Sequence, residues 1–210
     1  MKELEIKTKL VKDFTWYYEN KYITPRDGNA CLKTSNDSFL ITPSGVQKQI
    51  MSEMILLEVD QDGLLLSPSS LKPSIELHGH IIAIGIRGLP VSVHVHSMNT
   101  VSLFTLAKKL RVLDLLENNF KNHWPELFRY TKLGNSVPYL MPGSHELHES
   151  IKDSFLSNPM TDIIVLDRHG VITVGESLEE CKEHIQRLEH VSEITLKMIM
   201  ASNGDFNILR

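Results

Sequence analysis

The sequence of 210 residues has few cysteines, no long hydrophobic run and no excess of basic side chains. Its two cysteines, Cys31 and Cys181, form no CxxC pair, which suits a reducing compartment. No apolar run approaches the roughly 20 residues that cross a bilayer, and the first residues alternate charged and apolar side chains, unlike a secretory signal. The net charge of −4 leaves no broad positive field for nucleic acid. We therefore expect a cytoplasmic protein that binds neither membranes nor nucleic acid.

The composition is that of an ordinary globular protein. Hydrophobic residues make up 41% of the chain and charged residues 23%. A chain of this length can bury a substantial core in one domain and is rather short for two. The sequence shows no internal repeat, low-complexity tract or linker. We therefore expect a single domain over residues 1–210.

Hydrophobic spacing predicts a mixture of helices and short strands. Apolar residues at helical spacing predict helices over 2–19, 73–84, 101–109, 144–156 and 177–201. Short apolar or alternating runs between turn formers predict strands over 30–34, 38–42, 55–59, 64–66, 91–96, 163–166 and 171–174. Residues 110–133 fit neither pattern, and 137–142 suggest an irregular extended piece. The fold class is therefore α/β, with a mixed or antiparallel sheet flanked by helices.

Ten histidines are the unusual part of the composition. His94 and His96 lie two residues apart on a predicted strand, so both rings project from one face, about 7 Å apart at Cα. Catalytic zinc usually takes three protein ligands. His169, in a predicted strand-to-strand turn and followed by glycine, is the candidate third ligand. Taken alone, the pair is better explained as polar residues on the wet face of a sheet.

Two further histidine pairs carry less weight. His78 and His80 fall on a predicted helix, where residues two apart do not share a face. His80 is therefore interpreted as a helix-surface residue or as one placed behind the metal ligands. His145 and His148 have helical spacing and could bind a metal, but a solvated helix face explains them better.

A carboxylate and three small-residue segments complete the candidate site. Glu76 follows Pro73-Ser74-Ile75 at a predicted helix start, where the helix dipole favours an acid; its functional interpretation is a general acid/base beside a metal. Gly28-Asn29, Ser44-Gly45 and Pro73-Ser74 offer small residues and exposed amides suited to an anion. Each segment taken singly is only a turn.

In order along the chain, these pieces resemble the class II aldolase/adducin family. The resemblance covers about residues 24–195, most of the chain, and several motifs in the right order are more specific than any one. The matching segments are Gly28-Asn29-Ala30, Ile41-Thr42-Pro43-Ser44-Gly45-Val46, Lys72-Pro73-Ser74-Ile75-Glu76, Val93-His94-Val95-His96-Ser97, Asp167-Arg168-His169-Gly170-Val171 and Glu176-Ser177-Leu178-Glu179-Glu180.

The resemblance implies a fold, a metal and a set of roles. It implies an α/β fold with a central, mainly antiparallel sheet, and a homotetramer with sites at subunit interfaces. In the family's sugar-phosphate aldolases the equivalents of His94, His96 and His169 bind one Zn²⁺ per chain, and the equivalent of Glu76 is the acid/base. The phosphate-binding positions implied for this chain are Gly28, Asn29, Ser44, Gly45 and Ser74.

The resemblance leaves the reaction open between branches of the family. Residues 44–48 and 168–171 resemble the methylthioribulose-1-phosphate dehydratases, whereas residues 137–144 resemble the aldolases. We expect retro-aldol cleavage of a ketose 1-phosphate to dihydroxyacetone phosphate and an aldehyde, through a metal-stabilised enediolate. The alternatives are a dehydratase-like lyase and a non-catalytic adducin-like interaction domain. Ribulose-phosphate epimerases rank third among the enzymes because they usually carry aspartate where this chain has Glu76.

Two positions depart from the family pattern. Ile75 stands where many members have a small residue, which predicts an altered phosphate pocket or a different substrate. Tyr130 is the candidate counterpart of the aldolases' auxiliary tyrosine, although the alignment needs a gap to reach it. The metal is inferred, since an all-imidazole site near a carboxylate also suits manganese, cobalt or iron.

Overall fold

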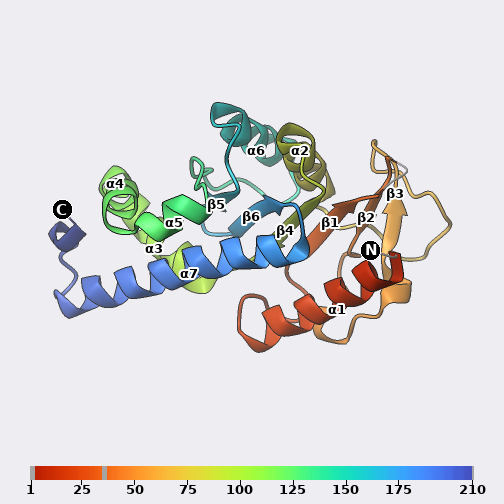
Figure 1. The fold of residues 1–210 in the computed structure, drawn as a ribbon, viewed down its shortest axis with the longest axis horizontal. Helices are drawn as coiled ribbons and strands as arrows, with labels where there is room; N and C mark the ends of the chain where they lie inside the picture. The colour runs from red at the N-terminus through yellow and green to blue at the C-terminus, as the bar shows by residue number, and fades with distance from the viewer. Residues whose placement is uncertain (1–2, 35–36, 210) are drawn as a thin grey trace.

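The centre of the molecule is a six-stranded sheet in which every neighbouring pair of strands is antiparallel (Figure 1). The structure is a computed structural model that describes residues 3–34 and 37–209. The sheet order is β3-β2-β1-β4-β6-β5. The strands are β1 (Asn29–Lys33), β2 (Phe39–Ile41), β3 (Leu57–Val59), β4 (Val91–Val95), β5 (Ile163–Leu166) and β6 (Gly170–Gly175). The predicted α/β class with a central antiparallel sheet is confirmed.

Helices cover both faces of this sheet (Figure 1). On one face, α2 and α6 pack against each other and share a hydrophobic cluster with β5 and β6. On the other, α1, α3 and α7 enclose the larger cluster, which includes every odd-numbered residue of β4. The described helices are α1 (Glu3–Glu19), α2 (Leu77–Arg87), α3 (Met98–Lys109), α4 (Leu113–His123), α5 (Pro125–Tyr130), α6 (His145–Ser157) and α7 (Leu178–Ala201), with single 3₁₀ turns at Lys48–Ile50, Glu53–Ile55 and Phe206–Leu209.

The register of β4 fixes which side chains lie together. β4 runs between β1 and β6, and His94 lies opposite Asn29 on one side and Ile172 on the other. Because successive side chains of a strand alternate between faces, Ser92 and His94 point to the face covered by α2. Val91, Val93 and Val95 point to the α1/α3/α7 face, where they are buried. Apolar anchoring on one face thus holds polar side chains rigidly on the other.

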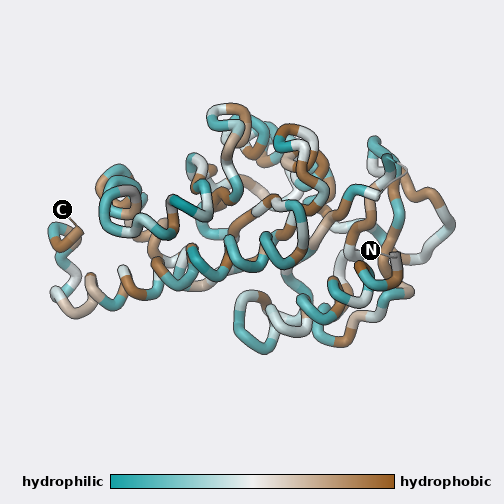
Figure 2. Tube along the Cα trace, viewed as in Figure 1, coloured by the Kyte–Doolittle hydropathy of each residue, from teal (hydrophilic) through white to brown (hydrophobic). Residues whose placement is uncertain are grey.

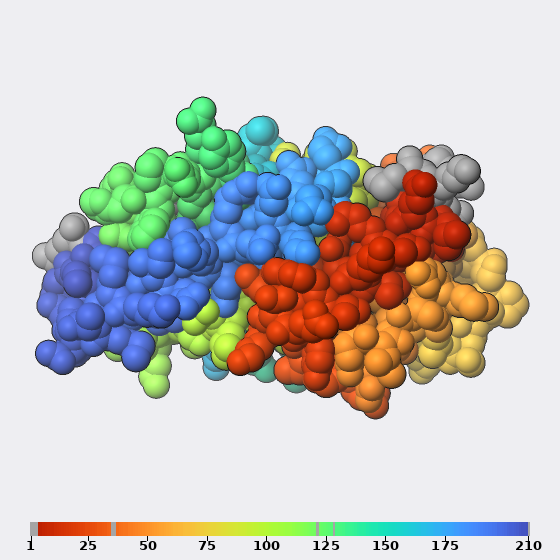
Figure 3. Space-filling view, turned by 60° about the horizontal axis from the view of Figure 1, so that its bottom comes forward, coloured from red at the N-terminus to blue at the C-terminus, as the bar shows by residue number. Residues whose placement is uncertain are grey.

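The long helix α7 is amphipathic and begins at a side-chain cap. Hydrophilic and hydrophobic residues alternate along it in Figure 2. Ser177 accepts a hydrogen bond from the backbone N–H of Glu180, as the capping-box spacing predicts. Figure 3 shows α1 and the start of α7 side by side, where the Lys182 ammonium lies 3.8 Å from the centre of the Trp16 ring. This contact joins α1 to α7 at one side of the core.

Several predicted boundaries were wrong. α2 begins at Leu77 rather than at Pro73, because Pro73 pairs with Pro43 in a bridge and Ser74 opens a turn. Residues 64–66 are not a strand: Leu65 alone bridges to β3, and all three leucines are exposed. The strand predicted over 55–59 is shortened by the 3₁₀ turn before it.

The helix predicted over 101–109 begins three residues earlier, at Met98, and the ambiguous stretch 110–133 forms α4 and α5. The break between α4 and α5 falls at Pro125, which occupies the first turn of α5, a position where the missing backbone N–H costs nothing. The helix predicted over 2–19 is observed from Glu3, and residue 2 lies outside the described residues. None of the described helices is long and apolar enough to cross a membrane.

Candidate metal and acid/base site

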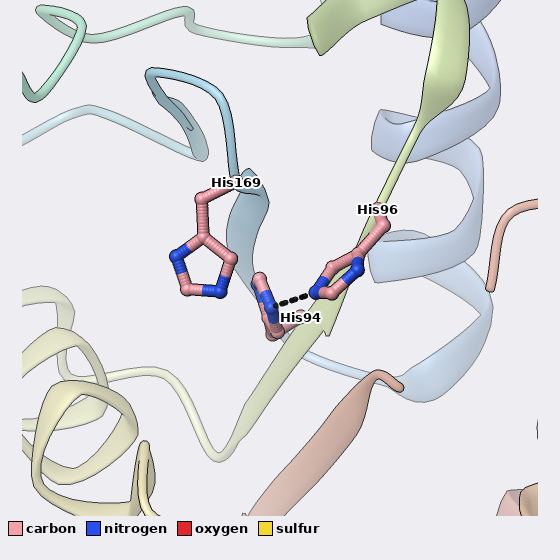
Figure 4. A group of neighbouring side chains, drawn as sticks. All are labelled: His94, His96 and His169. Carbon is pink, nitrogen blue, oxygen red and sulfur yellow. Dashed lines mark hydrogen bonds between the residues drawn. The ribbon is translucent and has the colours of Figure 1, made fainter. Parts of the chain in front are cut away.

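Three histidines from two parts of the chain meet at one end of the middle strands (Figure 4). His94 lies on β4, His96 follows directly after it, and His169 lies in the β5–β6 turn. One ligand nitrogen from each ring lies within 4.8 Å of the others. The ring centroids are 4.8 to 5.3 Å apart. The predicted meeting of these three imidazoles is therefore present.

His94 is held by one ring nitrogen, and its other nitrogen faces His96 and Glu76. Its Nδ1 donates a hydrogen bond to the backbone oxygen of Val171, at 2.8 Å, so in the neutral ring Nε2 keeps its lone pair. The ring is buried, with 1% of its side chain exposed. The β5–β6 turn approaches so closely that a Cβ on Gly170 would lie 2.4 Å from the oxygen of Val95. Glycine after His169 is therefore a steric requirement.

Each ring nitrogen of His96 has a polar neighbour. Its Nε2 lies 3.0 Å from Nε2 of His94, and its Nδ1 lies 3.5 Å from a carboxylate oxygen of Asp27. Its backbone N–H donates to the oxygen of Tyr22. These contacts place its ring beside His94 and leave it partly open to solvent.

The donor set fits a divalent transition metal. Burial lowers the pKa of His94 to about 3 and also lowers that of His96, so both rings are neutral at physiological pH, as ligation requires. Two nitrogens bound to a tetrahedral zinc at about 2.0–2.1 Å lie about 3.3 Å apart, close to the 3.0 Å between the two Nε2 atoms. Among the described residues, this is the one cluster of three or more potential ligands with metal spacing.

Glu76 lies directly against this cluster. It is the residue before α2, and its carboxylate oxygens lie 2.9 Å from Nε2 of His169 and 3.4 Å from Nε2 of His94. Asn29 donates a hydrogen bond to it at 2.6 Å. Burial alone would raise the pKa of Glu76, but the two histidines and Asn29 outweigh it and hold that pKa below its ordinary value. The result is a carboxylate that is buried and ionised beside the three imidazoles.

Of the three segments predicted to bind an anion, those at Asn29 and Ser74 bond Glu76, and the Ser44-Gly45 turn bonds Lys72. Ser44 donates its backbone N–H to the oxygen of Lys72, which places the Ser44-Gly45 turn beside the segment that leads to Ser74. The Ser74 hydroxyl in turn accepts the backbone N–H of Glu76. These hydrogen bonds join the segments to one another, and their role in phosphate binding stays a prediction.

Glycine is needed at both turns of this group. Gly28 and Gly45 have φ of +69° and +71°, a region that favours glycine. A Cβ on Gly28 would also lie 2.7 Å from Ile23, whereas the space beside Gly45 is open. The Ser44-Gly45 turn can therefore be approached closely by a ligand.

Two cations, Lys48 and Arg26, donate hydrogen bonds to backbone oxygens of the Ser44-Gly45 turn, which was not predicted from the sequence. The Lys48 ammonium is buried and donates to the backbone oxygens of Pro43 and Val46, at 3.1 and 3.0 Å. Arg26 donates to the oxygen of Gly45. The cations thus engage the carbonyl oxygens of Pro43, Gly45 and Val46, while the Ser44 N–H is bonded to the oxygen of Lys72.

Tyr130, the candidate auxiliary residue, is not part of this group in the described chain. It is the last residue of α5 and is 52% exposed. It lines a cavity that includes none of the three histidines, where its ring lies 5.4 Å from the guanidinium of Arg187. His78, His145 and His148 line another separate cavity, of about 490 Å³. The structure therefore does not bring these residues to the three metal-candidate histidines.

The cavity beside the candidate metal ligands was not predicted from the sequence. A cavity of about 730 Å³ opens next to His96 and His169 and is lined by the end of α1 and the start of α3, with Tyr18, Lys21 and Met98 in its wall. It gives a small molecule access to the histidines. The residues come from segments that the motifs do not include, so no local pattern pointed to them.

Sequence reasoning also left His80 unresolved. It is fully buried, so it is not a helix-surface residue, and its ring bonds Ser92 and Asn29. The spacing itself carried a signal: His80 follows Glu76 by four residues, and such pairs share one face of a helix.

The chain matches the family described as "Class II Aldolase and Adducin N-terminal domain" over residues 8–196. The chain belongs to the class II aldolase/adducin family. As a member of that family it is 30% identical over 189 residues to an L-fuculose phosphate aldolase of Methanococcus maripaludis, an alignment covering 90% of this chain and 93% of the relative. It is 24% identical over 193 residues to a methylthioribulose-1-phosphate dehydratase of Komagataella phaffii, covering 87% and 78%.

Solved structures of the family share the fold. A sugar-phosphate aldolase from Thermotoga maritima superposes with a TM-score of 0.78 at 20% identity, covering 96% of this chain and 98% of that one. An L-fuculose 1-phosphate aldolase superposes with a TM-score of 0.75 at 16% identity, covering 100% and 96%. The predicted family is thus confirmed. In this chain, His94, His96 and His169 could hold a divalent metal. Zinc as the ion, the roles of the other site residues and the tetramer stay predictions.

Proposed function

We propose that this class II aldolase/adducin protein is a metal-dependent lyase that cleaves a ketose 1-phosphate to dihydroxyacetone phosphate and an aldehyde. The observation that carries the proposal is the convergence of His94, His96 and His169 with the carboxylate of Glu76, 2.9 Å from the nearest imidazole. The 30% identity to a relative named as an L-fuculose phosphate aldolase supports it.

In this proposal each group of residues has one task. The three imidazoles hold one Zn²⁺, which when bound supplies a Lewis acid to polarise the substrate's carbonyl. The segments at Gly28-Asn29, Ser44-Gly45 and Ser74 bind the phosphate, and their binding energy holds the reacting carbons in place. Glu76 takes up the proton of the hydroxyl group that becomes the aldehyde and delivers it to the carbon that loses its bond to the aldehyde half. The buried position of Glu76 keeps bulk water from competing for that proton.

A dehydratase remains the second candidate, on a specific observation. Residues 44–48 and 168–171 resemble the methylthioribulose-1-phosphate dehydratases, and one such enzyme matches 87% of this chain. Both reactions begin at the carbon beside a polarised carbonyl. In the dehydratase the electron pair expels a hydroxyl group as water instead of breaking a carbon–carbon bond. The same residues would therefore serve either reaction.

Incubation of the purified protein with a panel of ketose 1-phosphates tests the proposal. We expect release of dihydroxyacetone phosphate from at least one substrate, with loss of activity on chelation and in His94→Ala. A dehydrated diketo product would assign the dehydratase reaction instead. Absence of turnover together with absence of bound metal would reject both enzymes and favour a non-catalytic interaction domain.

We also propose that the protein is a homotetramer with sites at its subunit interfaces. Large apolar side chains are exposed directly beside the site: Ile75, next to Glu76, is 58% exposed, and Met98, two residues after His96, is 56% exposed. Exposed apolar surface of this kind favours contact with another chain. Light scattering coupled to size-exclusion chromatography should give four times the mass of 23.9 kDa, and a monomer would contradict the proposal.

A further inference from the structure

A buried row of polar side chains runs behind Glu76. The Ser92 hydroxyl lies 2.6 Å from Nδ1 of His80, and Nε2 of His80 lies 2.5 Å from Oδ1 of Asn29. Nδ2 of Asn29 lies 2.6 Å from Oε2 of Glu76. Ser92 and His80 are completely buried, and Asn29 and Glu76 are less than 10% exposed. The row therefore joins the interior of the sheet to the candidate acid/base.

The chemistry of the end groups sets the direction of every hydrogen bond. An ionised carboxylate only accepts, so Asn29 must present its amide N–H to Glu76. The Asn29 oxygen then faces His80 and must receive a proton from Nε2–H. A neutral imidazole has one donor and one acceptor, so Nδ1 of His80 accepts from the Ser92 hydroxyl. One arrangement satisfies all four groups, in which His80 is the neutral Nε2–H tautomer.

His80 is not required there as packing material. The neighbouring positions of α2 that face the sheet, Leu77, Ala83 and Ile84, are apolar and buried, and a leucine would extend that surface. A buried imidazole costs free energy unless it is hydrogen-bonded, and here both ring nitrogens have partners. The polar side chain at this position therefore acts on its partners.

We propose that His80 is a positioning residue, which acts through Asn29 to hold the carboxylate of Glu76 in place for proton transfer. This inference rests on the proposed function. Without the Nε2–H donor, the Asn29 oxygen would lose its partner, and the amide would be free to turn away from the carboxylate. The donation from His80 thus holds the Asn29 amide in the orientation that Glu76 requires.

Two substitutions of His80 separate positioning from packing. The amide of His80→Gln can still donate to Asn29, whereas His80→Leu keeps the volume and removes the donor. With the substrate identified for the proposed function, we expect His80→Leu to lower kcat by about tenfold or more, with KM and metal content nearly unchanged. His80→Gln should recover most of that loss. The matched control is His184→Leu, a buried histidine that also bonds a hydroxyl group, in Thr131, and should keep the wild-type kcat.

A double-mutant cycle tests whether His80 acts through Asn29. In an Asn29→Ala background, His80→Leu should lower kcat no further, because its only route to Glu76 has been removed. Independent, additive losses would overturn the inference. So would a kcat for His80→Leu within twofold of wild type.

A measurement without substrate keeps the inference testable by itself. Nitrogen-15 NMR of the unmodified protein should show the His80 ring neutral, with the proton on Nε2. A ring protonated on Nδ1, or on both nitrogens at neutral pH, would overturn the inference even if His80→Leu failed to fold. Absence of turnover by the wild type would reject the proposed function and leave this tautomer as the deciding result.

Discussion

At the scale of single residues, His94 and Asn29 are each held by one polar atom and offer another to the site. Nδ1 of His94 is bonded to the Val171 oxygen and leaves Nε2 toward the cluster. Asn29 is held by His80 and offers its amide to Glu76. Such anchoring removes rotational freedom before a ligand arrives, so less free energy is needed to order the site on binding.

Glu76→Gln should separate metal binding from catalysis. The amide keeps the volume of the side chain but cannot take up a proton at physiological pH. We expect kcat to fall by about 10²–10⁴-fold, with the metal content unchanged because the three imidazoles remain. Steady-state kinetics and metal analysis of the same preparation give both values. Glu183→Gln, exposed on α7, is the control; equal kcat for wild type and Glu76→Gln would remove Glu76 from the mechanism.

His80 also predicts how stability depends on pH. Burial lowers its pKa from 6.5 to about 4, against the opposing charge of Glu76 and with a smaller contribution from His148. Between these values the unfolded chain binds a proton that the folded chain does not, so stability is lost as the pH falls from about 6.5 toward 4. Replacing His80 by Gln should flatten this dependence by about 1 kcal/mol per pH unit near pH 5.

The measurement is urea unfolding of metal-free wild type and His80→Gln at pH 7, 6 and 5. Metal-free protein is needed because ligation by histidines adds its own pH dependence. Parallel stability curves for the two proteins would show that His80 does not carry this proton.

At the scale of elements, the site depends on α3 starting where it does. α3 begins two residues after His96, and its cap residue, Ser97, makes no side-chain capping bond. The carboxylate of Glu189, on α7, takes that place: it accepts the backbone N–H groups of Asn99 and Thr100, at 2.9 and 2.8 Å, and also their side chains. A distant helix thus fixes the end of the metal-candidate segment.

Glu189→Ala should therefore destabilise the fold and loosen His96. Two backbone N–H groups would lose a charged acceptor, which we expect to cost about 2–3 kcal/mol of unfolding free energy. Chemical denaturation measures the loss, and metal affinity should fall with it. Glu193→Ala, on the next turn of α7 with an exposed partner in Lys197, should change neither. Equal stabilities for the two variants would contradict this account of the cap.

The elements themselves were largely predictable where one pattern dominates. The periodic helices over 2–19, 144–156 and 177–201 and the β-branched strands around His169 were found within a few residues. Predictions failed where non-local contacts decide. Pro73 pairs with Pro43 thirty residues away, which delays α2, and residues 64–66 have the composition of a strand but gain only a single bridge.

At the scale of the whole molecule, the sheet collects residues that are far apart in the sequence. β1, β4 and β6 are neighbours in the sheet, and this order brings Asn29, His94 and His169 to one end of it. The HxH spacing could show that two rings share a face, and the family resemblance could supply the third. Neither could show that His80 would be buried against Asn29, because that contact depends on how α2 lies across the sheet.

The central claim is that His94, His96 and His169 form one metal site, and metal analysis of protein purified without a histidine tag tests it most directly. We expect about one divalent ion per chain in the wild type, and none in His94→Ala or His169→Ala at unchanged secondary structure. His190→Ala, exposed on α7, should keep the ion. A wild-type protein without stoichiometric metal, or a His169→Ala variant that binds it as the wild type does, would contradict the account.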